Sequence, residues 1–297
     1  MEKKFFVFVI ALSVLCTLIA KPQDDLFTAC LQGDLAGVKE AVESGADVKA
    51  LNPASGQNAL AHAFFYPEIT RYLLEKGCDP NGGNYPALVS ASSVASLDVM
   101  KLLLENGADP NLPGINESAL LKVVQMTNCP DAAELLLSKG ADIKTTTSNY
   151  ANLLGVYASY GLPQIERKAA MTAYGNILKG YGLTVPEWYF NPSENLNEPP
   201  IEMVNVLVAA GLDINKRGTN LYDKKKSGEP PIFIAMNVGH QEIMLSLLEY
   251  GADYNETYLP ILPELPLFAI EGELTPLMYA CIKGYKVLLN GFFSSLT

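Results

Sequence analysis

The chain has 297 residues, of which 49% are hydrophobic, and its formal net charge at neutral pH is −11. This length and this hydrophobic content are sufficient for a continuous core. Because an acidic protein repels phosphate backbones, the composition argues against nucleic acid as the main partner.

The first 20 residues differ in composition from the rest of the chain. A basic start is followed by an apolar stretch, which ends at the small residue Ala20 and gives way to polar residues. This order is typical of a cleaved export signal, and the 16 residues from 5 to 20 are short for a membrane-spanning helix, which needs about 20. We therefore predict a signal peptide over 1–20 and an exported protein, periplasmic or secreted. An uncleaved leader, or a lipid on Cys16, is the alternative that would hold the chain at a membrane.

A three-residue phrase, Gly-Ala-Asp or a close variant of it, recurs at intervals of about 33 residues. Its copies begin at Gly45, Gly77, Gly107, Gly140, Gly211 and Gly251. The longer interval between Gly140 and Gly211 has room for one degenerate copy, for which Gly182 is the candidate. A repeat of this period predicts a stack of similar units rather than one globular core.

Each phrase follows an apolar run with helical spacing, as in residues 99–104 and 243–248. The glycine permits a left-handed backbone just past a helix end, and the aspartate opens a turn by bonding backbone amides. A second signal lies about 21 residues upstream of the glycine, clearest at Thr275-Pro276 and weaker at Pro230-Pro231. Threonine caps a helix and proline suits its first turn, so each unit is predicted to hold two short helices.

On these residues the chain resembles the ankyrin repeat over about residues 25–285. The resemblance implies an all-α solenoid of about seven to eight helix-turn-helix units, irregular in its second half, within the domain 21–297. It also implies binding of another protein through a concave surface of hairpin tips and first-helix residues, which fixes the mode of binding and not the target. We expect a monomer that needs no cofactor.

The cysteines follow the repeat. Cys30 and Cys281 occupy equivalent places, each after an alanine of a first helix, and Cys78 replaces the alanine of the Gly-Ala-Asp phrase. We therefore predict that cysteine stands in for a small buried residue. Because these three and Cys129 belong to different repeats, we predict no disulfide framework.

The second half departs from the regular pattern. Insertions are predicted near 160–200, 217–229 and 255–274, and the last repeat is incomplete. Since insertions in repeat proteins often emerge on the binding face, the candidate partner-binding residues are those of the first two insertions: Trp188, Tyr189, Phe190, Tyr222, Lys224, Lys225 and Lys226. The aromatic residues either anchor a partner or fill the gap left by a missing helix, and the lysines either bind an acidic partner or form a solvated loop tip.

Catalytic signatures are absent from the sequence. The chain has two histidines, His62 and His240, and no phosphate-binding loop, zinc-protease motif, nucleophile elbow or paired Cys/His ligands. We predict no catalytic, cofactor or metal site, and our main hypothesis is a non-catalytic interaction scaffold. One alternative is a secreted effector or a toxin/immunity-type binding protein with its specificity in the insertions. Another is an enzyme with a site in 150–200.

Overall fold

The computed structural model describes residues 22–114, 117–127, 129–144, 153, 201–217, 228–258 and 273–285. The predicted signal peptide over 1–20 lies outside these residues. The chain divides into two compact units. Unit 1 comprises residues 1–119 and 170–191, and unit 2 comprises residues 120–169 and 192–297.

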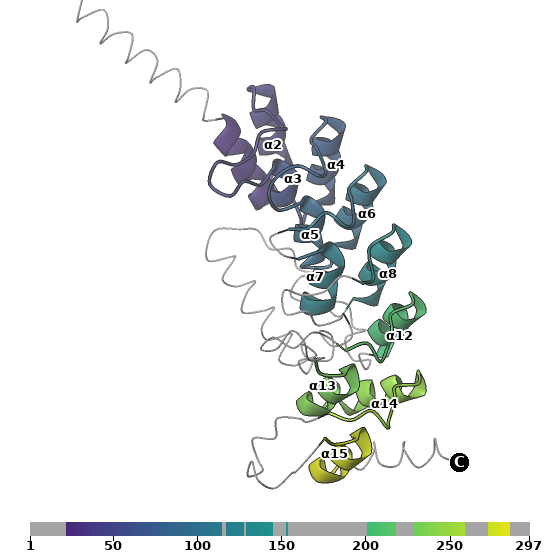
Figure 1. Ribbon diagram of the computed structural model, residues 1–297. Coiled ribbons are helices and arrows are strands. Elements are labelled where there is room, and N and C mark those ends of the chain that lie inside the picture. The colour runs from purple at the N-terminus through teal and green to yellow at the C-terminus, as the bar shows by residue number, and fades with distance from the viewer. Residues whose placement is uncertain are drawn as a thin grey trace, which may run out of the picture. The chain divides into compact units, whose positions relative to one another are not determined.

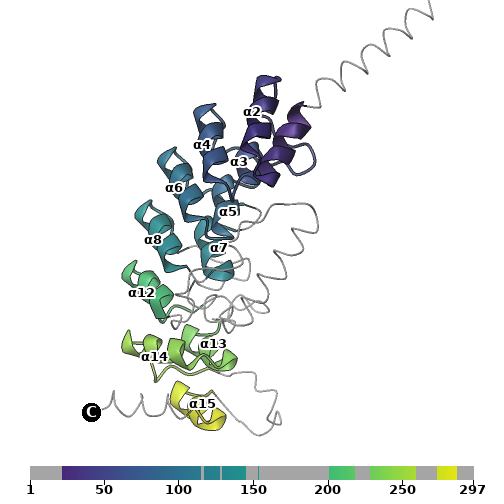
Figure 2. The ribbon, with the colours of Figure 1, turned by 180° about the vertical axis from the view of Figure 1, so that it is seen from behind.

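The described part of unit 1 consists of short antiparallel helix pairs. A helix at 22–32 precedes the others, which are α2 (Leu35–Glu43), α3 (Ala59–His62), α4 (Pro67–Glu75), α5 (Ala87–Ser92) and α6 (Leu97–Glu105). The second helices α2, α4 and α6 pack against one another in one row, and α3 packs against α5 in the other row, as both views show (Figures 1 and 2).

Unit 2 repeats the same two-row arrangement. Its described helices are α7 (Ala119–Met126), α8 (Pro130–Ser138), α12 (Ile201–Ala209), α13 (Pro231–Val238), α14 (Gln241–Glu249) and α15 (Pro276–Lys283). The first residue of α7, Ala119, still belongs to unit 1. The second helix α12 packs against both α8 and α14, and the first helices α13 and α15 pack against each other.

Helix starts and ends follow the predicted chemistry. The Thr275 hydroxyl accepts a hydrogen bond from the amide of Met278 at 3.3 Å and caps α15, whose first residue is Pro276. The six glycines of the repeated phrase have φ between 83° and 99°. No atom lies within 4 Å of where a Cβ would stand at Gly107 or Gly251, so backbone conformation alone accounts for glycine there.

The aspartates of the phrase form the predicted turns. In every copy the carboxylate accepts a hydrogen bond from the backbone amide two residues later, at 2.8–3.0 Å; the acceptors are Asp47, Asp79, Asp109, Asp142, Asp213 and Asp253. These carboxylates therefore act in the turns of their own repeats.

The core lies between the two rows of helices. Leu73, Leu103, Leu136 and Leu207 on successive second helices are all 0% exposed. Burying a leucine side chain contributes about 2 to 3 kcal/mol, so most of the stability of each hairpin comes from its contact with the neighbouring ones. The described residues contain isolated bridges rather than strands, at Gln57–Gly83 and Tyr258–Leu274.

The degenerate copy at Gly182, for which the interval between Gly140 and Gly211 has room, lies outside the described residues. One sequence prediction needs correction. Cys281 was expected to be buried, but it is exposed on α15, whereas Cys30 and Cys78 are buried as predicted. Among the described residues, no helix has both the length and the apolar character that crossing a bilayer requires.

Candidate functional site at the bases of two insertions

The residues that the sequence singled out for partner binding lie outside the described part of the chain. These are Trp188, Tyr189, Phe190, Tyr222, Lys224, Lys225 and Lys226. Residues 150–200, where an enzyme site was the alternative, are outside it as well, apart from the buried Leu153. The structure does describe the residues on both sides of the insertions at 217–229 and 255–274, and these define the candidate site.

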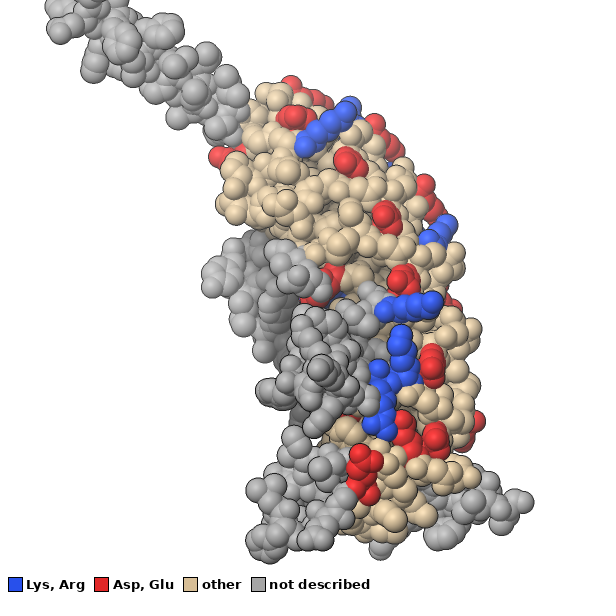
Figure 3. Space-filling model, in the orientation of Figure 1, with Lys and Arg blue, Asp and Glu red and all other residues tan. Residues whose placement is uncertain are grey.

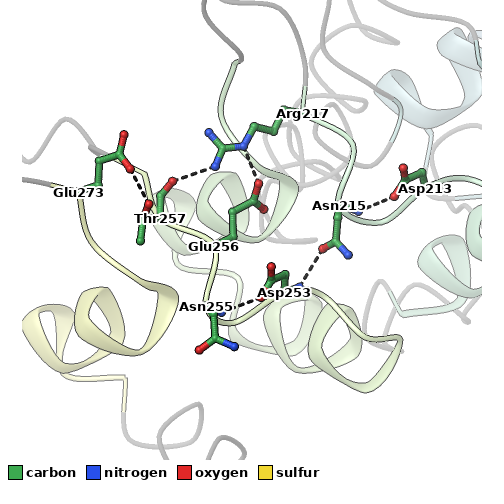
Figure 4. Close-up of polar contacts among 8 residues, drawn as sticks. All are labelled: Asp213, Asn215, Arg217, Asp253, Asn255, Glu256, Thr257 and Glu273. Atoms are coloured by element: carbon green, nitrogen blue, oxygen red, sulfur yellow. Dashed lines mark hydrogen bonds and ion pairs between the residues drawn. The ribbon is translucent and has the colours of Figure 1, made fainter.

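Successive repeats are joined by a side-chain clamp on the hairpin turns. The side-chain nitrogen of Asn81 donates to the carbonyl of Gly107 at 2.9 Å, and its side-chain oxygen accepts from the backbone amide of Asp109 at 2.8 Å. Asn215 makes the equivalent pair of bonds in unit 2. Its side-chain nitrogen donates to the carbonyl of Gly251 at 3.4 Å, and its side-chain oxygen accepts from the amide of Asp253 at 2.8 Å, the second of which Figure 4 shows. Each asparagine therefore fixes the position of the next hairpin turn.

Gln23 makes a similar contact at the start of unit 1. Its amide nitrogen donates to the carbonyl of Asp47 at 3.2 Å, and its amide oxygen accepts from the Asp47 amide at 2.9 Å. In the repeat phase, Asn255 corresponds to Asn81 and Asn215, but within the described residues its exposed side chain makes no hydrogen bond.

Arg217 joins the bases of the two insertions. Its Nε lies 2.6 Å from the Glu256 carboxylate, and its Nη2 donates to the Thr257 carbonyl at 2.8 Å (Figure 4). The guanidinium also lies over the Tyr258 ring, 5.9 Å from its centre. Because Arg217 begins one insertion and residues 256–258 begin the other, this ion pair holds their starting points together.

The insertion at 255–274 is closed at its own base. The Tyr258 amide donates to the Leu274 carbonyl at 3.0 Å and the Leu274 amide donates to the Tyr258 carbonyl at 2.8 Å. Beside this bridge, the Thr257 hydroxyl donates to the Glu273 carboxylate (Figure 4). The two ends of the insertion therefore leave and rejoin the repeat at the same place.

The end of the insertion at 217–229 is attached to the helices. Asn237 of α13 donates its side-chain amide to the Glu229 carboxyl, and its oxygen accepts from the Tyr279 hydroxyl of α15. Burial raises the pKa of Glu229 from its usual 4.5 to about 7, although the hydrogen bond from Asn237 opposes the rise. Burial also raises the pKa of Tyr258; the charge of Glu229 adds to this rise and that of Arg217 opposes it.

The aromatic rings of unit 2 support this network. Phe233 of α13 lies 5.6 Å from Tyr258 and 5.9 Å from Tyr279, measured between ring centres, and Phe233 itself is 0% exposed. The bases of both insertions thus rest on one buried ring, which makes them a single rigid platform of residues from α13, α15 and the turns after α12 and α14.

The sequence analysis did not predict this platform, although one sequence pattern indicates the asparagine clamp beside it. The phrase Asp-x-Asn recurs at residues 79–81, 109–111, 213–215 and 253–255, and its period could have identified the clamp. Arg217, Glu229 and Glu256 stand outside the repeat phase and have no such signal. Their partners are distant in sequence, so only the folded chain brings them together.

The remaining titratable groups do not form a catalytic constellation in the described residues. Burial lowers the pKa of His62, whose ring packs 5.4 Å from Phe27. Burial raises the pKa of the Cys30 thiol to about 12 and that of Cys78 to about 11, so neither is a ready nucleophile at neutral pH. No group of three or more potential metal ligands occurs in this part of the chain.

The face of the molecule shown in Figure 3 carries charges of both signs. Acidic side chains are scattered over the helices with basic ones between them on the face shown in Figure 3, which agrees with the net charge of −11.

The comparisons with known proteins agree with this architecture. Residues 26–113 match the family model of ankyrin repeats in three copies. The chain is 30% identical, over 49% of its length, to an ankyrin repeat and KH domain-containing protein, mask-1, from Caenorhabditis elegans. It is 28% identical, over 41% of its length, to a putative ankyrin repeat protein from Rickettsia felis. The matches cover 7% and 43% of those proteins, so the chain spans less than half the length of either relative.

A solved structure extends the comparison to the fold. The chain matches one chain of the complex of the Bd0816 predatory endopeptidase from Bdellovibrio bacteriovorus with the immunity protein Bd3460, with a TM-score of 0.53 and 21% identity. The match covers 76% of this chain and 97% of that one, and it concerns the fold alone. Residues 26–113 therefore carry ankyrin repeats, and the chain has an all-α repeat fold.

Proposed function

We propose that this chain is a non-catalytic scaffold that binds another protein through the platform at the bases of its two insertions, and that it acts after export from the cytoplasm. The observation that carries the proposal is the convergence of the insertions on one network, in which Arg217 joins Glu256 and Thr257. Rigid repeats bind with little loss of conformational freedom, because their surface is already ordered before docking.

Site-specific cross-linking tests the binding role. A photoreactive residue is placed at Tyr254, which is 42% exposed beside the platform, and separately at Lys101, which is exposed on α6. A protein captured by the full-length chain from its own compartment should cross-link from position 254, less from position 101, and should bind the purified chain directly. Equal cross-linking from both positions would place the binding surface elsewhere.

Export is tested separately. The proposal rests on the composition of residues 1–20, which is typical of a cleaved signal. Sequencing the N-terminus of the exported protein should find Lys21 as the first residue. A mature protein that still begins at Met1 would contradict cleavage, and a chain found only in the cytoplasm would contradict export.

A second candidate is a toxin/immunity-type or effector binding role, with specificity in the insertions. It is favoured by one observation, the likeness to a chain from an endopeptidase–immunity protein complex. If it holds, the captured partner should be harmful to cells by itself, and co-expression of this chain should relieve the harm. Relief that survives the substitution Arg217→Ala would argue against a role for the platform.

A further inference from the structure

Two exposed tyrosines flank the hairpin turn after α14. Tyr250 and Tyr254 stand on either side of the repeated phrase at 251–253, and they are 43% and 42% exposed. In the other copies of the phrase, the places before the glycine and after the aspartate hold no aromatic residue. Because exposed aromatic side chains are enriched where proteins bind each other, these two rings distinguish this turn from the others as a contact surface.

The turn is held in place by contacts within the chain. The Tyr250 hydroxyl donates to the side-chain oxygen of Asn205 on α12 at 2.9 Å, so the ring is fixed although much of it is exposed. The clamp from Asn215 to the Asp253 amide fixes the turn itself (Figure 4). A surface that is ordered in this way loses little conformational freedom when a partner docks.

The residues around the two rings are acidic. Residues 241–258 contain four acidic residues and no lysine or arginine. Glu249 precedes Tyr250, Asp253 precedes Tyr254, and both acidic residues are exposed. The face of an aromatic ring and a carboxylate both attract a positive charge, so this turn is complementary to a cationic group.

The chain contains a cation bound in this way a few residues further on. The Arg217 guanidinium pairs with Glu256 at 2.6 Å and lies over the Tyr258 ring, 5.9 Å from its centre. One carboxylate and one ring from the same short segment therefore hold one arginine of this chain. The turn at 249–254 exposes the same two kinds of group on the surface.

We propose that Tyr250 and Tyr254 anchor an arginine-bearing segment of the partner protein, whose guanidinium groups also pair with Glu249 and Asp253. This inference rests on the proposed binding role and adds the chemistry of the partner. A planar guanidinium can stack on a ring and bind a carboxylate at once, whereas an apolar anchor would leave the carboxylates without partners.

Fluorescence anisotropy with the full-length chain tests the proposal. The probe is a short fluorescent peptide of alternating arginine and glycine, and the reference peptide has citrulline, which keeps the shape of arginine without its charge. We expect the arginine peptide to bind and the citrulline peptide to fail. Tyr250→Ala and Tyr254→Ala should each weaken binding about threefold, and the double variant about tenfold. Tyr254→Phe, which keeps the ring, should bind like the wild type.

Tyr72→Ala on α4 is the control for the rings. Lys76 and Lys39 already lie over the Tyr72 ring, 5.4 Å and 5.7 Å from its centre, so its loss should leave peptide binding unchanged. If Tyr250→Ala does not fold because its bond to Asn205 is lost, Tyr254→Ala decides the question.

The charge contribution has its own matched pair of variants. Glu249→Gln beside the rings and Glu134→Gln on α8 each remove one exposed carboxylate from unit 2, and only the first should weaken binding, by about twofold. Equal losses in the test and control variants, or equal binding of the two peptides, would overturn the proposal. A dimer in sedimentation that Tyr254→Ala dissolves would also overturn it, because a second copy of the chain would then occupy the turn.

The peptide test and the cross-linking test can fail separately. A partner that cross-links from position 254 but binds the alanine variants as tightly as the wild type would keep the scaffold role and overturn the arginine contact. Peptide binding that depends on both tyrosines, without a partner that cross-links from that position, would support the arginine contact and contradict the scaffold role.

Discussion

Units 1 and 2 have the same repeated framework but use it differently. In unit 1 the hairpin turns are short, and neighbouring turns are joined by the Asn81 clamp. In unit 2 the same clamp recurs at Asn215, but two insertions leave the turns next to it and meet in a network around Arg217. The comparison shows that this repeat framework tolerates additions at its turns, because the helices that form the core are not disturbed by them.

The largest expected effect tests whether the framework of unit 1 depends on stacking. In Leu103→Asp, a carboxylate would replace a side chain that is 0% exposed, which should cost several kcal/mol and loosen neighbouring helices as well. Thermal unfolding followed by circular dichroism measures the loss. Lys101→Ala on the exposed side of the same helix is the control and should unfold like the wild type. An unchanged melt in Leu103→Asp would contradict stacking.

The clamp allows the two units to be compared directly. Asn81→Ala in unit 1 and Asn215→Ala in unit 2 each remove two hydrogen bonds, so each should cost about 1 to 2 kcal/mol in urea unfolding. Asn255→Ala is the matched control, because the same repeat position makes no side-chain hydrogen bond within the described residues. A loss for Asn255→Ala as large as the other two would show that the clamp is not the cause.

Replacing the turn glycine should reduce the free energy of unfolding by the same amount in both units. Gly107→Ala and Gly251→Ala place a Cβ where no atom lies within 4 Å, at φ of 88° and 90°, so each should cost about 1 kcal/mol through backbone strain alone. Chemical denaturation of both variants gives the values. Gly33→Ala provides a contrast with a larger cost, because its Cβ would lie 2.4 Å from the Tyr66 ring. Unequal costs at Gly107 and Gly251 would mean that the insertions alter the turn.

The smallest effect at neutral pH concerns His62 in unit 1. Burial lowers the pKa of this ring below its usual 6.5, so the unfolded state binds the proton more readily than the folded state. The stability that neutral His62 contributes is present above pH 6.5 and is lost as the pH falls. Hydrogen exchange of peptides covering 59–75 should therefore increase on acidification, and His62→Gln should remove the increase. Equal acid sensitivity in the variant would exclude His62 as its source.

The sequence alone determined the repeat. The period of the Gly-Ala-Asp phrase and the helix-start residues Thr275 and Pro276 predicted helix pairs, left-handed glycines and aspartate turns, because these depend on interactions within a few residues of each other. The sequence did not predict that α12 packs against α8, since no local signal shows which helices will pack together.

The tertiary structure decided the candidate site. The contacts that join Arg217 to Glu256, Glu229 to Asn237 and Asn237 to Tyr279 link residues from different turns and helices, and no periodicity marks them. Cys281 shows the same limit, because its exposure depends on which helix face has a neighbour and not on its place in the repeat. The conformation of a turn depends on residues next to each other in the sequence. The burial of a side chain and its pKa depend on groups that only the fold brings together.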